Sequence, residues 1–240
     1  MSSEQLNPYE RIILALDFAD FNESEKWVKR FSSKIKTYKV GPILYVKNGT
    51  DVLKRFSELG ADIFLDLKFH DIPSTVEKTV RQLADLNINM FTLHALGGFD
   101  MMKRVSESVA EEADKLSKQK PITLAVTVLT SHDESTLSEI GINNSTKDEV
   151  LKLAGVADKA GIDGLVCSGQ ELEFIKQEFG DRFKLVIPGI RPASNVHDQK
   201  RVMTPEAAVS KGADYLVIGR AITEAEDPDE VVEQIKKDIS

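Results

Sequence analysis

A short signal that ends a helix and starts a strand recurs along this chain. Gly60-Ala61-Asp62, Gly161-Ile162-Asp163 and Gly212-Ala213-Asp214 each follow a helical pattern and precede a short apolar run. Asn87-Ile88-Asn89 does the same with asparagine in place of glycine. Glycine and asparagine adopt the left-handed conformation that closes the last turn of a helix. A repeated helix stop followed by a strand is typical of βα units in series, and it restricts the possible folds severely.

Short strand-like runs follow one another along the whole chain, and most are apolar throughout, as expected of parallel strands covered on both faces. They are Ile12–Leu16, Thr37–Val40, Asp62–Leu67, Met90–His94, Ile122–Leu129, Gly164–Cys167, Lys184–Ile187 and Tyr215–Ile218. Capping signals open several helical stretches between them: Asn22 with Glu25, Ser74 with Glu77, Ser168 with Glu171, and Thr204 before Pro205.

The predicted fold class is therefore α/β, a single-domain (β/α)8 TIM barrel over residues 1–240, with a doubly wound sheet as the alternative. No linker rich in Pro, Gly or Ser divides the chain. Residues 1–10 are predicted to be a polar N-terminal tail. Residues 191–205 are polar without a helix or strand pattern, which predicts a lid-like loop.

The composition excludes several classes of protein. Lys and Arg total 31 against 39 Asp and Glu, a net charge of −8 without any basic run, so a nucleic-acid partner is not expected. No apolar stretch approaches the roughly 18 residues that span a bilayer, and the first ten residues hold no apolar signal region. The single cysteine, Cys167, cannot form an internal disulfide, which favours a reducing, cytoplasmic location.

Polar and charged residues follow the predicted strands, at the end where barrel enzymes carry their chemistry. They are Asp17, Lys39, the run Asp66-Leu67-Lys68-Phe69-His70-Asp71, His94, Thr130, Arg191 and Arg220. On the third strand, Asp66 and Lys68 are two residues apart and should face the same side. An ammonium group among carboxylates stays charged, which makes Lys68 a poor nucleophile and a good proton donor. An ion-pair network that only closes the barrel end is the alternative.

Two further segments indicate a phosphate group. Gly219-Arg220 follows the eighth strand, where barrel enzymes commonly bind phosphate, and Arg191 supplies a second cation after the seventh. Gln199, in the lid-like loop, can donate a hydrogen bond to a ligand. The histidines show no regular metal-ligand spacing, and His94 reads equally well as a hydrogen-bonded structural residue. No GxGxxG or Walker motif supports a dinucleotide or ATP cofactor.

Taken together, these residues resemble the orotidine 5′-phosphate decarboxylase family in its compact bacterial form. The matching segments run from residue 14 to residue 221, and the run Asp66 to Pro73 is the most specific. The others are Leu14–Asp17, Lys39–Gly41, Leu93–Ala95, Val128–Ser131, Pro188–Pro192, Asp198–Val202 and Ile218–Arg220. The lid differs somewhat, because residues 194–197 lack the glycines that many members carry.

The resemblance implies a role for each matching residue. Catalysis would rest on Lys68, Asp66, Asp71 and Lys39, with Lys68 protonating C6 of the pyrimidine and Asp66 against the substrate carboxylate. Asp17 and Lys39 would hold the ribose hydroxyls, and Thr130 the pyrimidine edge. Arg191, Gln199, Gly219 and Arg220 would bind the phosphate. Ile72, Thr75 and Pro188 complete the substrate-binding residues.

The resemblance also implies partners and cofactors. The substrate and product would be orotidine 5′-phosphate and uridine 5′-phosphate, in de novo pyrimidine synthesis, with no metal and no organic cofactor. Asp71 and Ile72 would reach into the site of a neighbouring subunit, so that a homodimer shares each active site. No nucleic acid or membrane partner is expected.

Three alternative functions remain for a barrel of this kind. 3-Keto-L-gulonate 6-phosphate decarboxylase and hexulose phosphate synthase share the Asp-x-Lys-x-x-Asp strand but use magnesium, with a carboxylate where this chain has Lys39. A Schiff-base aldolase would use Lys68 as a neutral amine, which the flanking carboxylates disfavour. A catalytically silent barrel would bind a nucleotide without converting it.

Overall fold

The computed structural model describes residues 6–192 and 203–240, and in it parallel strands form a closed barrel in the order of the sequence, β1 to β8. The strands are β1 (Ile12–Ala15), β2 (Thr37–Val40), β3 (Asp62–Phe69), β4 (Met90–His94), β5 (Ile122–Val126), β6 (Gly164–Val166), β7 (Lys184–Pro188) and β8 (Tyr215–Ile218). Each predicted strand is present and the (β/α)8 fold is confirmed. The largest differences are that β3 continues to Phe69 and that β5 ends at Val126 instead of Leu129.

Helices separate the strands. The α-helices are α1 (Phe21–Phe31), α2 (Pro42–Asn48), α3 (Asp51–Glu58), α4 (Pro73–Leu83), α5 (Gly98–Leu116), α6 (Glu134–Glu139), α7 (Thr146–Lys159), α8 (Leu172–Phe179), α9 (Pro205–Ser210), α10 (Arg220–Thr223) and α11 (Pro228–Asp238). Short 3-10 helices are η1 (Pro8–Arg11), η2 (Ala84–Leu86), η3 (Ala95–Gly97) and η4 (Gly169–Glu171). None of the helices in the described ranges is long and apolar enough to cross a membrane.

Two of the predicted helix caps are confirmed and two are wrong. Ser168 and Glu171 form a capping box at η4, and the Thr204 hydroxyl accepts a hydrogen bond from the Ala207 amide at α9. α1 begins at Phe21 and is capped instead by Asp20, whose carboxylate accepts a hydrogen bond from the Glu23 amide. α4 begins at Pro73 after Ile72, without a side-chain cap.

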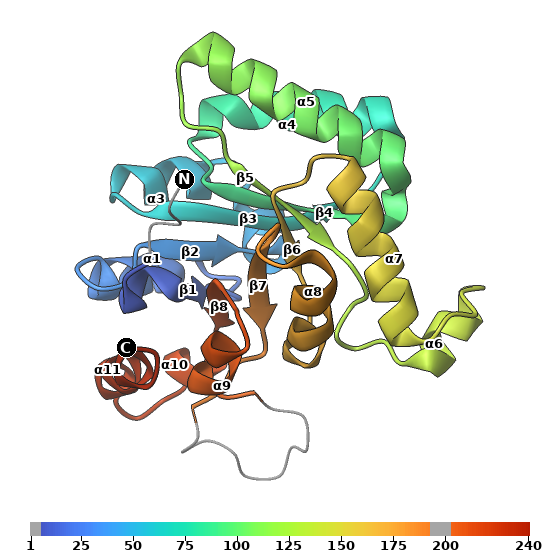
Figure 1. Cartoon of the computed structure of the whole chain (residues 1–240). Coiled ribbons are helices and arrows are strands. Elements are labelled where there is room, and N and C mark those ends of the chain that lie inside the picture. Colours follow the sequence, from blue (N-terminus) through green and yellow to red (C-terminus); the bar gives the residue numbers. More distant parts are fainter. Residues whose placement is uncertain (1–5, 193–202) are drawn as a thin grey trace. The chain divides into compact units, whose positions relative to one another are not determined.

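The chain comprises two compact units, Met1–Phe64 with Val186–Ser240, and Leu65–Leu185. In the first unit, β1 pairs with both β2 and β8 (Figure 1). Ile13 therefore lies beside Thr37 and Val217. Every residue of these three strands is buried. Burial of this apolar surface drives the unit together and fixes the strand ends that carry Asp17, Lys39 and Gly219.

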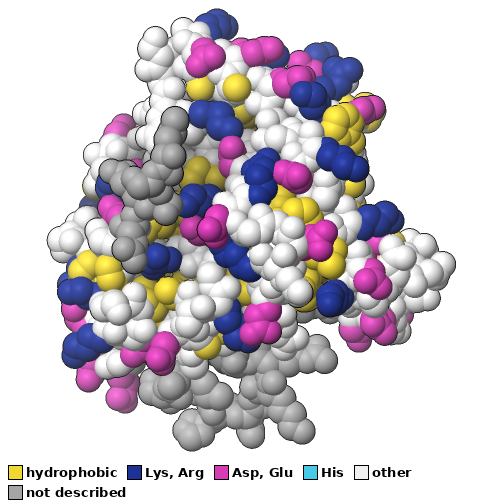
Figure 2. All heavy atoms as spheres, in the orientation of Figure 1, with side chains coloured by type: hydrophobic (Ala, Val, Ile, Leu, Met, Phe, Trp, Pro, Cys, Tyr) yellow, Lys and Arg dark blue, Asp and Glu magenta, His cyan; other side chains and the backbone are white. Residues whose placement is uncertain are grey.

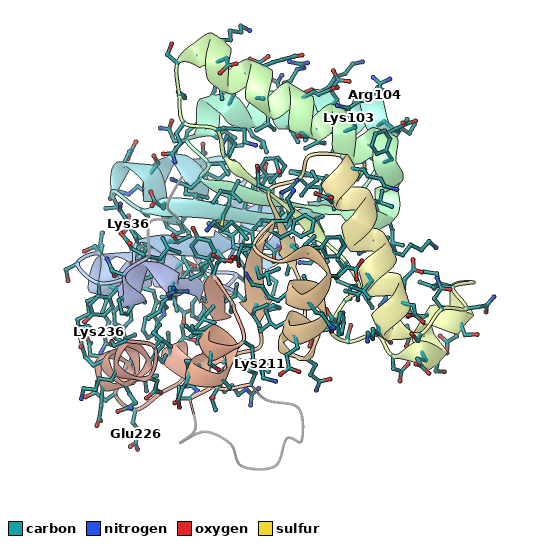
Figure 3. All side chains as sticks on the ribbon, viewed as in Figure 1. Lys36, Lys103, Arg104, Lys211, Glu226 and Lys236 are labelled. Atoms are coloured by element: carbon teal, nitrogen blue, oxygen red, sulfur yellow. The ribbon has the colours of Figure 1, made fainter. Side chains whose placement is uncertain are left out.

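In the second unit, β5 pairs with β4 and β6, which places Thr92 beside Leu124 and Ala125 beside Leu165. Helices α4 and α5 pack along each other (Figure 1). Acidic and basic side chains are interspersed over this helix pair (Figure 2). Arg104, labelled on α5 in Figure 3, reaches Glu77 of α4 at 3.1 Å. The end of β3 and the whole of β4 belong to this unit.

A close backbone approach next to β6 explains the glycine at position 164. A Cβ atom on Gly164 would lie 2.4 Å from the Lys184 carbonyl oxygen and 2.8 Å from Leu124 Cδ2. Gly164→Ala is therefore expected to lower the free energy of unfolding by about 1–3 kcal/mol, because the strands must move apart. Urea denaturation measures the change.

Gly155 of α7 provides the matched control for this prediction. A Cβ atom there meets nothing within 4 Å, so Gly155→Ala should stabilise the fold by about 0.5–1 kcal/mol through helix propensity. Equal effects of the two substitutions would contradict the close approach at Gly164.

Candidate active site

The end of β3 places the predicted acid and ammonium group in direct contact. Lys68 Nζ lies 2.8 Å from Asp66 Oδ1, so the expectation that both side chains face the same side is confirmed. The Asp66 side chain is 14% exposed and that of Lys68 is 36% exposed. A cation held beside a mostly buried carboxylate can stabilise negative charge that develops on a ligand or donate a proton to it.

Thr92 of β4 is a site residue that the sequence interpretation missed. Its buried Oγ1 accepts a hydrogen bond from the Lys68 amide at 2.9 Å and donates one to Asp66 Oδ1 at 2.9 Å. A threonine at alternate spacing from His94 in an otherwise apolar strand is the signal that was available. The sequence alone does not reveal that the hydroxyl contacts residues of β3.

Two histidines lie at the ends of the same two strands, His70 after β3 and His94 at the end of β4. The rings of His70 and His94 stack with centroids 5.6 Å apart, and His94 Nδ1 accepts a hydrogen bond from the Leu96 amide. Burial, followed by the charges of His70, Lys68 and His132, lowers the pKa of His94 to about 4. The structure supports the alternative that the sequence left open for His94, a hydrogen-bonded histidine, and the ring is neutral at physiological pH.

His94 is expected to weaken the fold as the pH falls from about 6.5 towards 4. Unfolded chains bind this proton near pH 6.5, whereas folded His94 binds it only near its pKa of about 4. Its contribution is complete above pH 6.5 and is lost on acidification, by about 1–2 kcal/mol after allowing for partial exposure. Urea unfolding of wild-type and His94→Asn chains at about pH 7 and about pH 4.5 tests this, since Asn can accept the same hydrogen bond. An identical pH dependence in both chains would contradict it.

The loop after β3 exposes the next group of predicted residues. Asp71 is exposed and its Oδ1 accepts a hydrogen bond from the Ile72 amide at 2.6 Å. The Ile72 side chain is 68% exposed, and Thr75 is exposed in the first turn of α4. Thr130, after β5, is exposed as well. All of these side chains are accessible to a ligand or to another subunit.

In the first unit, the ends of β1 and β2 form a second ion pair. Lys39 Nζ lies 2.7 Å from Asp17 Oδ1, and the lysine side chain is only 11% exposed. A Cβ atom on Gly41 would come within 3.1 Å of Lys39 Nζ and 3.2 Å of Asp17 Oδ1. Glycine at position 41 therefore leaves room for the pair, whose carboxylate is half exposed and can accept hydrogen bonds from hydroxyl groups.

The predicted phosphate-binding residues of this unit follow β7 and β8. Gly189, after Pro188, has a φ of +75°, which favours glycine, and the Arg191 amide donates to the Met203 carbonyl at 3.1 Å. That bond ties the two described edges of the lid-like loop together. Gln199 lies outside the described residues. Gly219 precedes α10, whose first residue is the exposed Arg220.

A cavity of about 240 Å³ lies away from these strand ends, between α4, η2 and α5. Its walls are mostly apolar and include Val80, Leu83 and Leu116. None of the predicted site residues lines it.

Comparison with known proteins shows the family of this chain. Residues 10–235 match the model of the orotidine 5′-phosphate decarboxylase / HUMPS family. The chain belongs to this family. The match includes every strand of the barrel and every candidate site residue named above.

Relatives in the family are similar over nearly their whole length. Orotidine 5′-phosphate decarboxylase of Pseudoalteromonas translucida is 44% identical over 236 residues, which are 97% of this chain and 99% of the relative. That of Actinobacillus succinogenes is 46% identical over 231 residues, 96% and 98% of the two chains. The crystal structure of the Lactobacillus acidophilus enzyme superposes with a TM-score of 0.81, at 37% identity over 96% of this chain and 99% of that one.

Proposed function

We propose that this chain decarboxylates orotidine 5′-phosphate to uridine 5′-phosphate, in de novo pyrimidine synthesis and without a cofactor. The observation that carries the proposal is the Asp66–Lys68 ion pair at the end of β3, in a chain of this family. The relatives that bear the name of this activity cover nearly the full chain. Free Cys167 is buried, in keeping with a reducing, cytoplasmic location.

In this mechanism, Lys68 is the proton donor. The bond between C6 and the carboxylate breaks, carbon dioxide leaves, and the electron pair remains on C6. Lys68 Nζ transfers a proton to C6 and regains one from solvent. The ammonium group is already held in place by Asp66, so it stabilises the developing carbanion more than the substrate. Asp66 lies against the substrate carboxylate, while Asp71 and Lys39 complete the charged array.

The remaining residues hold the substrate away from the reacting carbon. Asp17 and Lys39 bind the ribose hydroxyls, and their ion pair is already formed. The phosphate is bound by Arg191, Gln199, Gly219 and Arg220, with Gly219 offering a backbone amide. Thr130 contacts the pyrimidine edge, and Ile72, Thr75 and Pro188 line the substrate. Binding energy from the phosphate positions the carboxylate near Asp66.

We also propose that the active enzyme is a homodimer in which Asp71 and Ile72 enter the site of the neighbouring subunit. Large apolar side chains of the second unit are unusually exposed: Ile72 at 68%, Leu96 at 41% and Phe99 at 44%. Exposed apolar groups of this size favour burial against another protein chain. Sedimentation of the protein with and without uridine 5′-phosphate tests the dimer.

The second candidate function is that of the magnesium-dependent barrel enzymes such as hexulose phosphate synthase, because the description of the matching family names HUMPS beside orotidine 5′-phosphate decarboxylase. They carry a carboxylate at the end of the second strand. Here that position is Lys39, which is paired with Asp17 at 2.7 Å. A lysine removes a ligand for the metal and repels a cation, so the structure favours the first candidate.

Incubation of the protein with orotidine 5′-phosphate and EDTA tests the proposed function. The ultraviolet change to uridine 5′-phosphate should proceed at the same rate with and without EDTA. Failure to convert this substrate, with conversion of a sugar phosphate that EDTA abolishes, would replace the proposal with the magnesium-dependent alternative. Borohydride trapping of Lys68 with a ketose phosphate would instead indicate an aldolase. Binding of the nucleotide without conversion would indicate a silent barrel.

A further inference from the structure

The backbone of Lys68 adopts a conformation that is unusual for its position. Its φ is 50°, in the left-handed region that a residue with a Cβ atom rarely occupies. Among described residues other than glycine, only Asn87 and Ser117 share a positive φ, and they close η2 and α5. Lys68 lies inside strand β3 and ends no helix. Something other than helix termination must hold it there.

The hydroxyl of Thr92 provides this restraint. The Lys68 amide donates to Thr92 Oγ1 at 2.9 Å, so a side chain on β4 accepts a bond that a regular strand would give to a backbone carbonyl. An amide can only donate and an ionised carboxylate can only accept, so the Thr92 hydroxyl must donate its proton to Asp66. That bond is 2.9 Å long.

The contacts close into a ring. Asp66 Oδ1 accepts from the Thr92 hydroxyl at 2.9 Å and from Lys68 Nζ at 2.8 Å. The Thr92 hydroxyl therefore holds the Lys68 backbone directly, and it holds the Lys68 side chain through Asp66. Thr92 is 0% exposed, and a β-branched side chain has few rotamers, so the ring does not have to be assembled from a mobile group.

We propose that Thr92 is a positioning residue that fixes the Asp66–Lys68 pair for proton transfer. The inference rests on the proposed function, in which Lys68 Nζ protonates C6. Thr92 itself touches neither substrate nor product in this proposal. It holds the lysine backbone in its left-handed conformation and the carboxylate in one orientation, so that the ammonium group is in place before substrate binds.

Three variants test the proposal. Thr92→Val removes the hydroxyl and keeps the shape, whereas Thr92→Ser keeps the hydroxyl. Thr127→Val is the matched control, since Thr127 is also 0% exposed and its Oγ1 has no hydrogen-bond partner in the described structure. If Thr92→Val does not fold, Thr92→Ala provides the same comparison with a small cavity in place of the methyl group.

With orotidine 5′-phosphate as substrate, Thr92→Val should lower kcat by about 10- to 100-fold, the loss expected for hydrogen bonds to a charged group. The KM should stay within about twofold, because the phosphate and ribose contacts are untouched. Thr92→Ser should recover most of the kcat, and Thr127→Val should equal the wild type. A merely structural role would lower the melting temperature of Thr92→Val and leave the kcat of the folded protein unchanged, which would overturn the proposal.

A crystal structure of Thr92→Val separates this inference from the proposed function. The variant should show Lys68 outside the left-handed region or Nζ beyond hydrogen-bond distance of Asp66. An unchanged Lys68 would overturn the inference even if the wild-type chain is fully active. A wild-type chain that does not convert orotidine 5′-phosphate would refute the proposed function, whatever the variant structure shows.

Discussion

Replacing Lys68 with alanine is expected to reduce kcat for orotidine 5′-phosphate by about 10⁴-fold or more. General acid catalysis typically contributes about 10²- to 10⁴-fold, and a preorganised charge beside the reacting atom adds about 10²- to 10³-fold. Lys68→Ala removes both effects at once. Stopped assays at high enzyme concentration, with uridine 5′-phosphate separated from substrate, measure the residual rate.

The fold should survive this substitution. The Lys68 side chain is 36% exposed, so its ion pair with Asp66 adds little stability, and alanine keeps the same Cβ atom. Thr92 still donates to Asp66. Lys103, an exposed lysine of α5 whose Nζ lies 2.7 Å from Glu107, is the matched control, and Lys103→Ala should keep full activity. Near-normal kcat in Lys68→Ala would refute the proton-donor role.

The fold could be predicted from sequence because the strands can be recognised from short local patterns. A helix stop such as Gly161 or Gly212 precedes a short apolar run, and strands buried on both faces need no alternation to be recognised. Strand ends were less predictable. Val128 is apolar and buried like the residues of β5, yet it lies beyond the pairing of β5 with β4 and β6. Apolar character marks burial, whereas the end of a strand depends on its neighbours.

Helix starts show a second limit of local patterns. Asn22 with Glu25 matches a capping box, but Asp20 lies nearby and its carboxylate reaches the Glu23 amide. Both residues satisfy the same chemistry, and only the backbone direction after β1 decides between them. Before α4, Pro73 supplies a fixed φ at the first helical position, so the helix begins without a cap from Ser74.

The candidate site was predictable where its geometry lies within one strand. Asp66 and Lys68 are two residues apart, and a period of two is enough to place them together. Thr92 contacts both of them from β4. The sequence of neither strand predicts the register between β3 and β4, and it is this register that brings the Thr92 hydroxyl to Lys68. The left-handed backbone of Lys68 was equally hidden, because nothing in a lysine indicates a positive φ.

Replacing Arg220 with alanine is expected to raise the KM for orotidine 5′-phosphate by about 10²-fold, with a smaller loss of kcat. Arg220 is exposed at the start of α10, directly after Gly219, and its guanidinium can bind a phosphate through two charge-assisted hydrogen bonds. Each such bond contributes about 1.5–3 kcal/mol. Because phosphate binding also positions the carboxylate, part of the loss should appear in kcat. Steady-state kinetics over a wide substrate range separates the two constants.

The substrate without its phosphate makes this prediction specific. If Arg220 acts through the phosphate, Arg220→Ala and removal of the phosphate affect the same interaction, so kcat/KM for orotidine should be nearly equal in wild-type and variant chains. A general disturbance of the strand end would lower kcat/KM for both substrates. Arg104→Ala, on the surface of α5 and paired with Glu77 at 3.1 Å, should change neither value. An unchanged KM for orotidine 5′-phosphate in Arg220→Ala would show that the phosphate is held elsewhere, and Arg191 would then be the next arginine to test.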